Sequence, residues 1–200
     1  MARKTISKKI TDALHKEYEH RCAVCGGSSP HIHHIDEDSS NNELLNLLPL
    51  CPNCHLSDQH NPTRKVEIRK LQLFRKYKDP AILKPQFHPI YTRQLFLETV
   101  MLSEEPIDDI ESQANELIEF IQSFEMGEFY GRRLNELIGP LHQVFVMSFN
   151  SVPDPAYEKQ LRATSINYRQ HIISNRESAC KLIIELLRYQ SWANADKIPN

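Results

Sequence analysis

The sequence predicts an α+β protein in two parts, a small zinc-stabilised domain followed by a mainly α-helical bundle. Two Cys-x-x-Cys pairs occur within the first 60 residues of the 200-residue chain. Prolines at positions 80, 85 and 89 then interrupt the chain, and apolar residues recur at helical spacing after them. We therefore expect one domain over 1–80 and a second over 81–200.

The cysteine pairs predict one structural Zn²⁺. Each Cys-x-x-Cys turn aims two sulfurs at a common point, and a spacer of 25 residues lets the second turn lie beside the first. Free cysteines in a packed core would leave both two-residue gaps as a coincidence. The expected zinc ligands are Cys22, Cys25, Cys51 and Cys54.

Two adjacent histidines, His33 and His34, lie between the cysteine pairs in a segment that reads as a short strand. Because side chains alternate faces along a strand, these two diverge and cannot easily share one role. We therefore expect one histidine to bind metal and the other to accept a proton, since imidazole titrates near neutrality.

These residues resemble the HNH nuclease family, also called the ββα-metal fold. Its pattern is a His-His-Ile or Asp-His-Ile strand, a central Asn and a Cys-x-x-Cys-His ending. The resemblance covers about residues 1–80 and agrees in residue type, order and spacing. The matching segments are His33-His34-Ile35, Asn46-Leu47-Leu48-Pro49-Leu50 and Cys51-Pro52-Asn53-Cys54-His55.

The resemblance implies a zinc-stabilised HNH nuclease domain with defined residue roles. His33 and His55 are implied as ligands of the catalytic divalent ion, and His34 as the general base. Two protein ligands leave the cation mostly to water and phosphate, which favours Mg²⁺. Two imidazoles also suit Mn²⁺, Ni²⁺ or Zn²⁺.

Asn46 completes the pattern, and its amide carries both a donor and an acceptor with which to tie the loop back onto the strand. We expect it to orient His34 without touching substrate. The other interpretation is a loop residue that satisfies a local turn, as we expect for Asn41 and Asn42.

Several other polar residues near the motif have more than one interpretation. His31 shares strand parity with His33, so it either adds a ligand or phosphate contact or is simply an exposed strand-end residue. His60, five residues after His55, is a weaker candidate ligand because Asn-Pro interrupts the helix directly after it. We interpret the acidic run 36–38 as a solvated turn rather than a metal cluster.

Composition favours an ordinary globular protein, with 40% hydrophobic and 25% charged residues. No apolar run approaches 18 residues and no leader pattern is visible, so we expect a cytoplasmic protein without membrane contact. Cys180 is expected to be buried on an apolar helix face. Five glycines leave no room for a Walker-type loop, which argues against an NTPase.

Charge places the expected DNA contacts in the first domain. Residues 1–80 hold 13 Lys/Arg against 10 Asp/Glu, whereas residues 81–200 hold 11 against 16. The later basic run also contains apolar residues at helical spacing, so a helix that packs one face is compatible with phosphate contacts on the other. The two basic runs are Arg3, Lys4, Lys8 and Lys9, and Arg64, Lys65, Arg69, Lys70, Arg75, Lys76 and Lys78.

Helical spacing predicts a helix over residues 5–20 and a helical second domain. We expect this second domain to serve self-association, or to position a partner or substrate. No Lys or Arg occurs over 94–131, which indicates a solvated acidic face or, alternatively, a docking surface for a basic partner. Two separate helices are expected after Asp154-Pro155. The apolar positions are Leu95, Val100 and Leu102; Ile107 to Phe124; Leu134, Leu137, Ile138, Leu141, Val144 and Phe145; Tyr157, Leu161 and Tyr168; and Leu182, Ile183, Leu186 and Leu187.

The sequence thus predicts a metal-dependent HNH endonuclease acting on DNA. The resemblance implies a setting such as restriction or phage defence. The alternative is a zinc-stabilised nucleic-acid-binding module or a partner-regulated subunit with no cleavage of its own.

Overall fold

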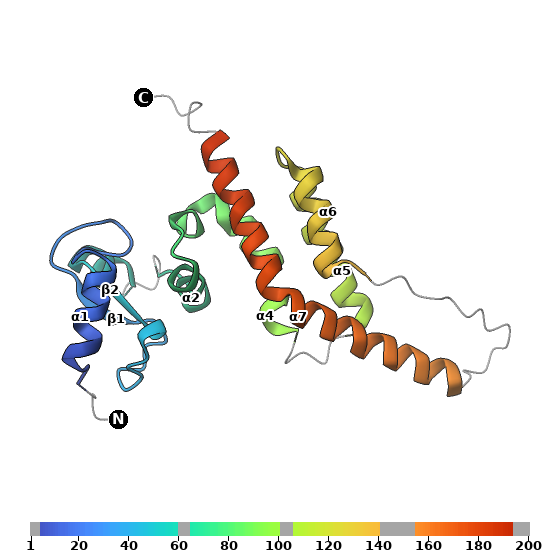
Figure 1. Cartoon of the computed structure of the whole chain (residues 1–200), viewed down its shortest axis with the longest axis horizontal. Helices are drawn as coiled ribbons and strands as arrows, with labels where there is room; N and C mark the ends of the chain where they lie inside the picture. Colours follow the sequence, from blue (N-terminus) through green and yellow to red (C-terminus); the bar gives the residue numbers. More distant parts are fainter. Residues whose placement is uncertain (1–4, 60–64, 101–105, 141–154, 194–200) are drawn as a thin grey trace. The chain divides into compact units, whose positions relative to one another are not determined.

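The computed structural model describes residues 5–59, 65–100, 106–140 and 155–193 (Figure 1). It divides into an N-terminal unit, residues 1–84, and a C-terminal unit, residues 85–200. This division falls in the proline-rich segment where the sequence places a boundary. Outside the described residues lie Arg3, Lys4, His60, Arg64, Leu102, Leu141, Val144 and Phe145, together with the side chains of Tyr157 and Leu161.

The first helix, α1 (Lys8–Glu17), is shorter at both ends than the predicted span 5–20. Ser7 caps its start, with the side-chain oxygen accepting a hydrogen bond from the Ile10 N–H at 3.4 Å. The helix ends because Glu19 and His20 both adopt positive φ, which an α-helix cannot include.

A two-stranded antiparallel hairpin follows. Strand β1 (His31–His34) pairs with β2 (Leu47–Leu50), with His33 opposite Leu48 and His34 opposite Leu47. Every residue of β2 is buried, whereas β1 alternates, with His33 buried and its neighbours more exposed. A short 3₁₀ turn, η1 (Leu44–Asn46), leads into β2. The hairpin therefore buries His33 and leaves His34, on the other face of β1, more exposed.

After β2 the chain forms η2 (Asn53–Gln59), a π-helical segment, and then α2 (Ile68–Tyr77). Helix α2 buries Leu71 and Phe74 and ends at Lys78, whose left-handed conformation lets its N–H donate to the Phe74 carbonyl at 2.7 Å. The N-terminal unit thus combines a small sheet with helices, as the α+β prediction requires.

Three cations of the predicted basic run are engaged within the unit. Arg75 is only 2% exposed, and its guanidinium bonds Glu17, the Tyr18 hydroxyl and the Leu44 carbonyl. Lys78 pairs with Glu17 at 2.6 Å, and Lys65 pairs with a glutamate of the hairpin loop. The buried Arg75 therefore belongs to the packed face of this run, and the prediction of phosphate contacts by part of the run concerns its exposed cations. Arg69 and Lys76 remain exposed on α2.

The proline-rich segment is not a featureless linker. It forms η3 (Pro80–Leu83) and η4 (Pro85–Phe87), two short 3₁₀ turns. Asp79 caps η3 by accepting a hydrogen bond from the Ala81 N–H at 2.8 Å, and Pro80 occupies the first helical position, where no N–H is needed.

The C-terminal unit is helical, as predicted. It contains α3 (His88–Gln94), α4 (Phe96–Thr99), α5 (Ile107–Gln122), α6 (Gly127–Ile138) and α7 (Pro155–Ala193), and α6 packs against both α5 and α7 (Figure 1). The tight α5–α6 corner needs Gly127, because a Cβ there would lie 2.4 Å from the Ile121 carbonyl oxygen.

Helix α7 is continuous over 39 residues, so the prediction of two separate helices is wrong. No proline or glycine interrupts residues 156–193, and Ile172 and Ala179 extend the buried face between the two predicted segments. Tyr168 is buried and donates its hydroxyl to the Ile138 carbonyl at 2.9 Å. Cys180 is 3% exposed, which confirms its predicted burial. None of the helices in the described part of the chain has the length and apolar character needed to cross a membrane.

Candidate metal centre and active site

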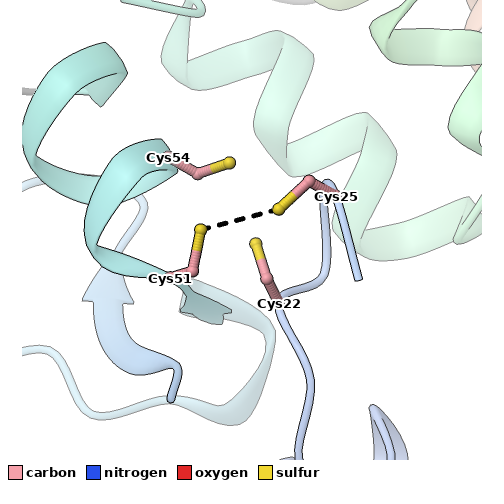
Figure 2. Close-up of side chains that lie close together, drawn as sticks. All are labelled: Cys22, Cys25, Cys51 and Cys54. Carbon is pink, nitrogen blue, oxygen red and sulfur yellow. Dashed lines mark hydrogen bonds between the residues drawn. The ribbon is translucent and has the colours of Figure 1, made fainter. Parts of the chain in front are cut away.

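The four predicted cysteines converge on one point. The sulfurs of Cys22, Cys25, Cys51 and Cys54 all lie within 4.8 Å of one another, and Cys25 and Cys51 come to 3.5 Å (Figure 2). Four sulfurs held tetrahedrally at about 2.3 Å from one Zn²⁺ are about 3.8 Å apart. The observed spacing therefore fits a Cys₄ zinc site without rearrangement of the backbone.

Backbone hydrogen bonds hold the first cysteine turn in shape. The Gly26 N–H donates to the Cys22 carbonyl at 2.9 Å, and the Cys22 N–H donates to the Gly27 carbonyl at 2.8 Å. Gly26 takes φ of +70°, a conformation that glycine adopts without strain. The Ala23 N–H donates to the Pro49 carbonyl at 2.8 Å, so this turn is tied to β2, the strand that leads into the second pair.

The four thiols influence one another's ionisation. A backbone hydrogen bond from Cys54 lowers the pKa of Cys51 to about 7, whereas burial raises the pKa of the Cys54 thiol. Thiolates this close repel one another, so they ionise together only when a cation balances their charge. Cys25 is exposed while the other three are buried. A dication such as Zn²⁺ satisfies this set.

Two imidazoles meet beside the cysteine cluster. The rings of His33, on β1, and His55, in η2, lie edge to face with centroids 5.2 Å apart and planes at 72°. His33 is 6% exposed and His55 is half-buried. Two imidazoles bound to one ion at about 2.1 Å from each nitrogen place their ring centres about 5 Å apart, so this pair fits a shared cation.

His34 occupies the opposite side of β1, as strand alternation predicts. Its Nε2 lies 3.0 Å from Asn42 Oδ1, and Asn42 Nδ2 donates to the Thr5 carbonyl at 3.4 Å. An amide oxygen only accepts, so Nε2–H is the donor, and in the neutral ring Nδ1 then carries the lone pair. The contact with Asn42 holds the imidazole in this orientation. Sequence reasoning assigned Asn42 to a local turn and missed this contact.

Asn46 ties the hairpin loop to the end of β1, as predicted. Its Nδ2 donates to Asp36 Oδ1 at 2.7 Å and to the Asn41 carbonyl at 3.0 Å, while its Oδ1 accepts from the Asp36 N–H at 3.0 Å. Burial acts to raise the pKa of Asp36, but the hydrogen bonds it accepts outweigh burial and lower the pKa. The described hydrogen bonds of Asn46 do not include His34, so any influence on that ring passes through the loop.

The remaining candidates of the motif region divide as follows. The acidic run 36–38 is occupied by turn hydrogen bonds and by the pairing of Glu37 with Lys65, which agrees with a solvated turn. Among the described residues, three or more metal-ligating side chains come close together only in the cysteine cluster. His31 is exposed and lines an open groove together with His55.

No protein-family model, curated protein or solved structure matches this chain.

Proposed function

We propose that this protein is a metal-dependent HNH endonuclease that hydrolyses phosphodiester bonds in DNA. The observation that carries the proposal is the division of labour around β1. His33 and His55 lie ring to ring on one side, while His34 is oriented on the other by Asn42. A metal-binding pair and a separate, oriented base are what hydrolysis of a phosphodiester requires.

In this proposal His33 and His55 hold the catalytic divalent cation, for which two protein ligands favour Mg²⁺. When bound, such a cation neutralises charge on the phosphoryl group and on the leaving oxygen. His34 takes the proton of the attacking water at Nδ1, because Nε2 is committed to Asn42. Asn46 and Asp36 keep the loop that carries Asn42 closed against β1.

The cysteine cluster holds the segments that carry the histidines in place. Cys54 directly precedes His55, and Cys51 lies four residues before it. The turn of the first pair is bonded to β2, the partner of the strand that bears His33 and His34. Zinc held there fixes both segments relative to each other in a unit whose core is small. The zinc is therefore structural, and the histidines carry the chemistry.

Charge supports DNA as the substrate class. The exposed cations of the N-terminal unit include Lys8 and Lys9 on α1 and Arg69 on α2, and exposed cations are the groups that contact phosphates. The acidic C-terminal unit is suited instead to assembly or to positioning the nuclease on a partner.

The test is nicking of supercoiled plasmid by the purified full chain with Mg²⁺, with Mn²⁺ and with EDTA. Relaxed plasmid is expected only with metal, and none from His34→Ala. His20→Ala, which removes an exposed histidine of the same unit, is the matched control and is expected to cut at the wild-type rate. Plasmid binding without cutting under any divalent ion would favour the alternative, a zinc-stabilised binding module.

A further inference from the structure

An open groove of about 810 Å³ borders the proposed metal pair in the N-terminal unit. Its lining combines two imidazoles with aliphatic side chains. The lining includes Ile6, Pro30, His31, Ile32, His55 and Leu56. The volume lies in the range of about 300–1,000 Å³ that is typical of sites for small organic groups. His55 belongs to both the groove and the proposed metal pair, so the two are continuous.

Beside Ile6, the charged groups near the groove in the sequence are basic. None of the described residues that line it carries a carboxylate. Ile6 lies two residues before α1, whose first turn contains Lys8 and Lys9 and no acidic residue, so the positive end of that helix adjoins the groove wall. The aliphatic wall is formed by Ile6, Ile32 and the 62%-exposed Leu56. A ligand with a flat apolar part and a negative charge suits this combination.

We propose that this groove holds the nucleotide next to the scissile phosphate, with His31 donating a hydrogen bond to a phosphate oxygen of that nucleotide. Its sugar and base lie against Ile6, Ile32 and Leu56. This inference rests on the proposed nuclease function, and it assigns to His31 a role in holding substrate.

His31 acts on phosphate rather than as a third metal ligand. It shares the strand face of His33, two residues away, and is exposed where His33 is buried. Within the described ranges, only the four cysteines bring three or more metal-ligating side chains close together. His31, His33 and His55 therefore do not form a set of three metal ligands. His31 is therefore placed to meet a group that enters from solvent.

The first experiment puts a negative charge into the groove. Leu56→Glu is compared with Leu45→Glu, because Leu45 is 66% exposed in the same unit and does not line the groove. The probe is a fluorescein-labelled 20-base-pair duplex, and its Kd is measured by anisotropy in Ca²⁺. Leu56→Glu is expected to weaken binding about tenfold, by repulsion of a phosphate, and Leu45→Glu less than about twofold. Equal effects from both variants would overturn the proposal, since they would report only net charge.

The second experiment separates phosphate contact from metal binding. His31→Ala is expected to raise the Kd for the duplex, and His31→Gln, which keeps an N–H donor, to recover most of the affinity. Mn²⁺ affinity, measured by calorimetry without DNA, is expected to stay at the wild-type value in His31→Ala and to fall in His55→Ala. Loss of Mn²⁺ affinity in His31→Ala would make it a metal ligand and overturn the phosphate role.

Failure of the groove and failure of the nuclease are distinguishable. Wild-type protein that cuts plasmid, together with a Leu56→Glu variant that binds duplex as tightly as wild type, overturns the groove assignment and leaves the nuclease standing. Wild-type protein that binds duplex through the groove but never cuts overturns the nuclease alone. Each variant is first checked for one equivalent of zinc, so that an unfolded sample is not scored.

Discussion

Arg75 Nη2 lies 2.8 Å from Glu17 Oε2, so the last turn of α2 is joined to the end of α1 across 58 positions of sequence. The same guanidinium donates to the Leu44 carbonyl through Nε and Nη2, at 3.3 and 3.2 Å. One buried side chain therefore connects both helices of the N-terminal unit to the turn that leads into β2.

We predict that Arg75→Ala destabilises the protein by about 2 kcal/mol, because it removes several hydrogen bonds and leaves the Leu44 carbonyl without these donors. Arg69→Ala, which removes an exposed cation of the same helix, is the control and is expected to change stability by less than about 0.5 kcal/mol. Urea unfolding of the zinc-loaded protein measures both. Equal stability of the two variants would contradict a structural role for Arg75.

The pairing of Arg75 with Glu17 predicts that the stability of the fold depends on pH. Hydrogen bonding from Arg75, helped by Lys78, outweighs burial and lowers the pKa of Glu17 below its ordinary value of 4.5. The carboxylate therefore stabilises the fold fully above that ordinary value, and the contribution is lost as pH falls through the lowered pKa. The melting temperature of wild type is expected to exceed that of Glu17→Gln at pH 7, with the gap closing below about pH 4.5. A gap that widens in acid would refute the assignment.

One tightly held Zn²⁺ per chain is expected to survive dialysis. Cys51→Ser should lose zinc and fold poorly, because metal binding supplies folding free energy to a small core. Cys180→Ser is the matched control, since that thiol is buried in α7 and is not one of the four clustered cysteines, and it should retain one equivalent. Elemental analysis decides the matter, and zinc well below one equivalent in folded wild type would exclude the site.

Substitutions of the neighbouring histidines His33 and His34 should impair cleavage in different ways. His34→Ala is expected to abolish cleavage while leaving fold, zinc and DNA binding intact, because the base acts only in the chemical step. Raised Mg²⁺ or Mn²⁺ should restore part of the activity of His33→Ala and His55→Ala, but none to His34→Ala. Single-turnover cleavage of labelled duplex across a metal titration measures this. Metal rescue of His34→Ala alone would reverse the two roles.

Asn42→Ala should slow cleavage about ten- to hundredfold, since the His34 ring loses the acceptor 3.0 Å from Nε2 that selects its tautomer. Asn42→Asp keeps an acceptor and should retain more activity. Ser40→Ala, in the same loop, alters turn hydrogen bonds without touching His34 and serves as the control. A single-turnover rate for Asn42→Ala equal to that of Ser40→Ala would show that the contact is incidental.

The parts of the molecule that sequence predicted are those that short-range spacing determines. Two-residue gaps are enough to bring the sulfurs of each cysteine pair together, and strand alternation is enough to separate His33 from His34. Helical periodicity likewise identified α5 and the burial of Cys180. In each case the pattern and the structure involve the same few neighbouring residues.

The parts that sequence missed depend on where distant segments meet. Arg75 reads as one more cation in a basic run until α1 places Glu17 beside it. Asn42 reads as a turn residue until the loop folds back toward His34. The two-helix prediction for α7 failed because Ile172 and Ala179, which continue its buried face, were not recognised as part of one stripe.

The single long α7 has a consequence for the order in which the chain can fold during synthesis. Tyr168 bonds the Ile138 carbonyl, Arg169 the Val100 carbonyl and Gln190 the Glu125 carbonyl, at separations of 30, 69 and 65 residues. Helices α5 and α6 emerge from the ribosome well before the surface that completes their core. The N-terminal unit is a compact unit of residues 1–84, so we expect it to fold before α7 has been synthesised.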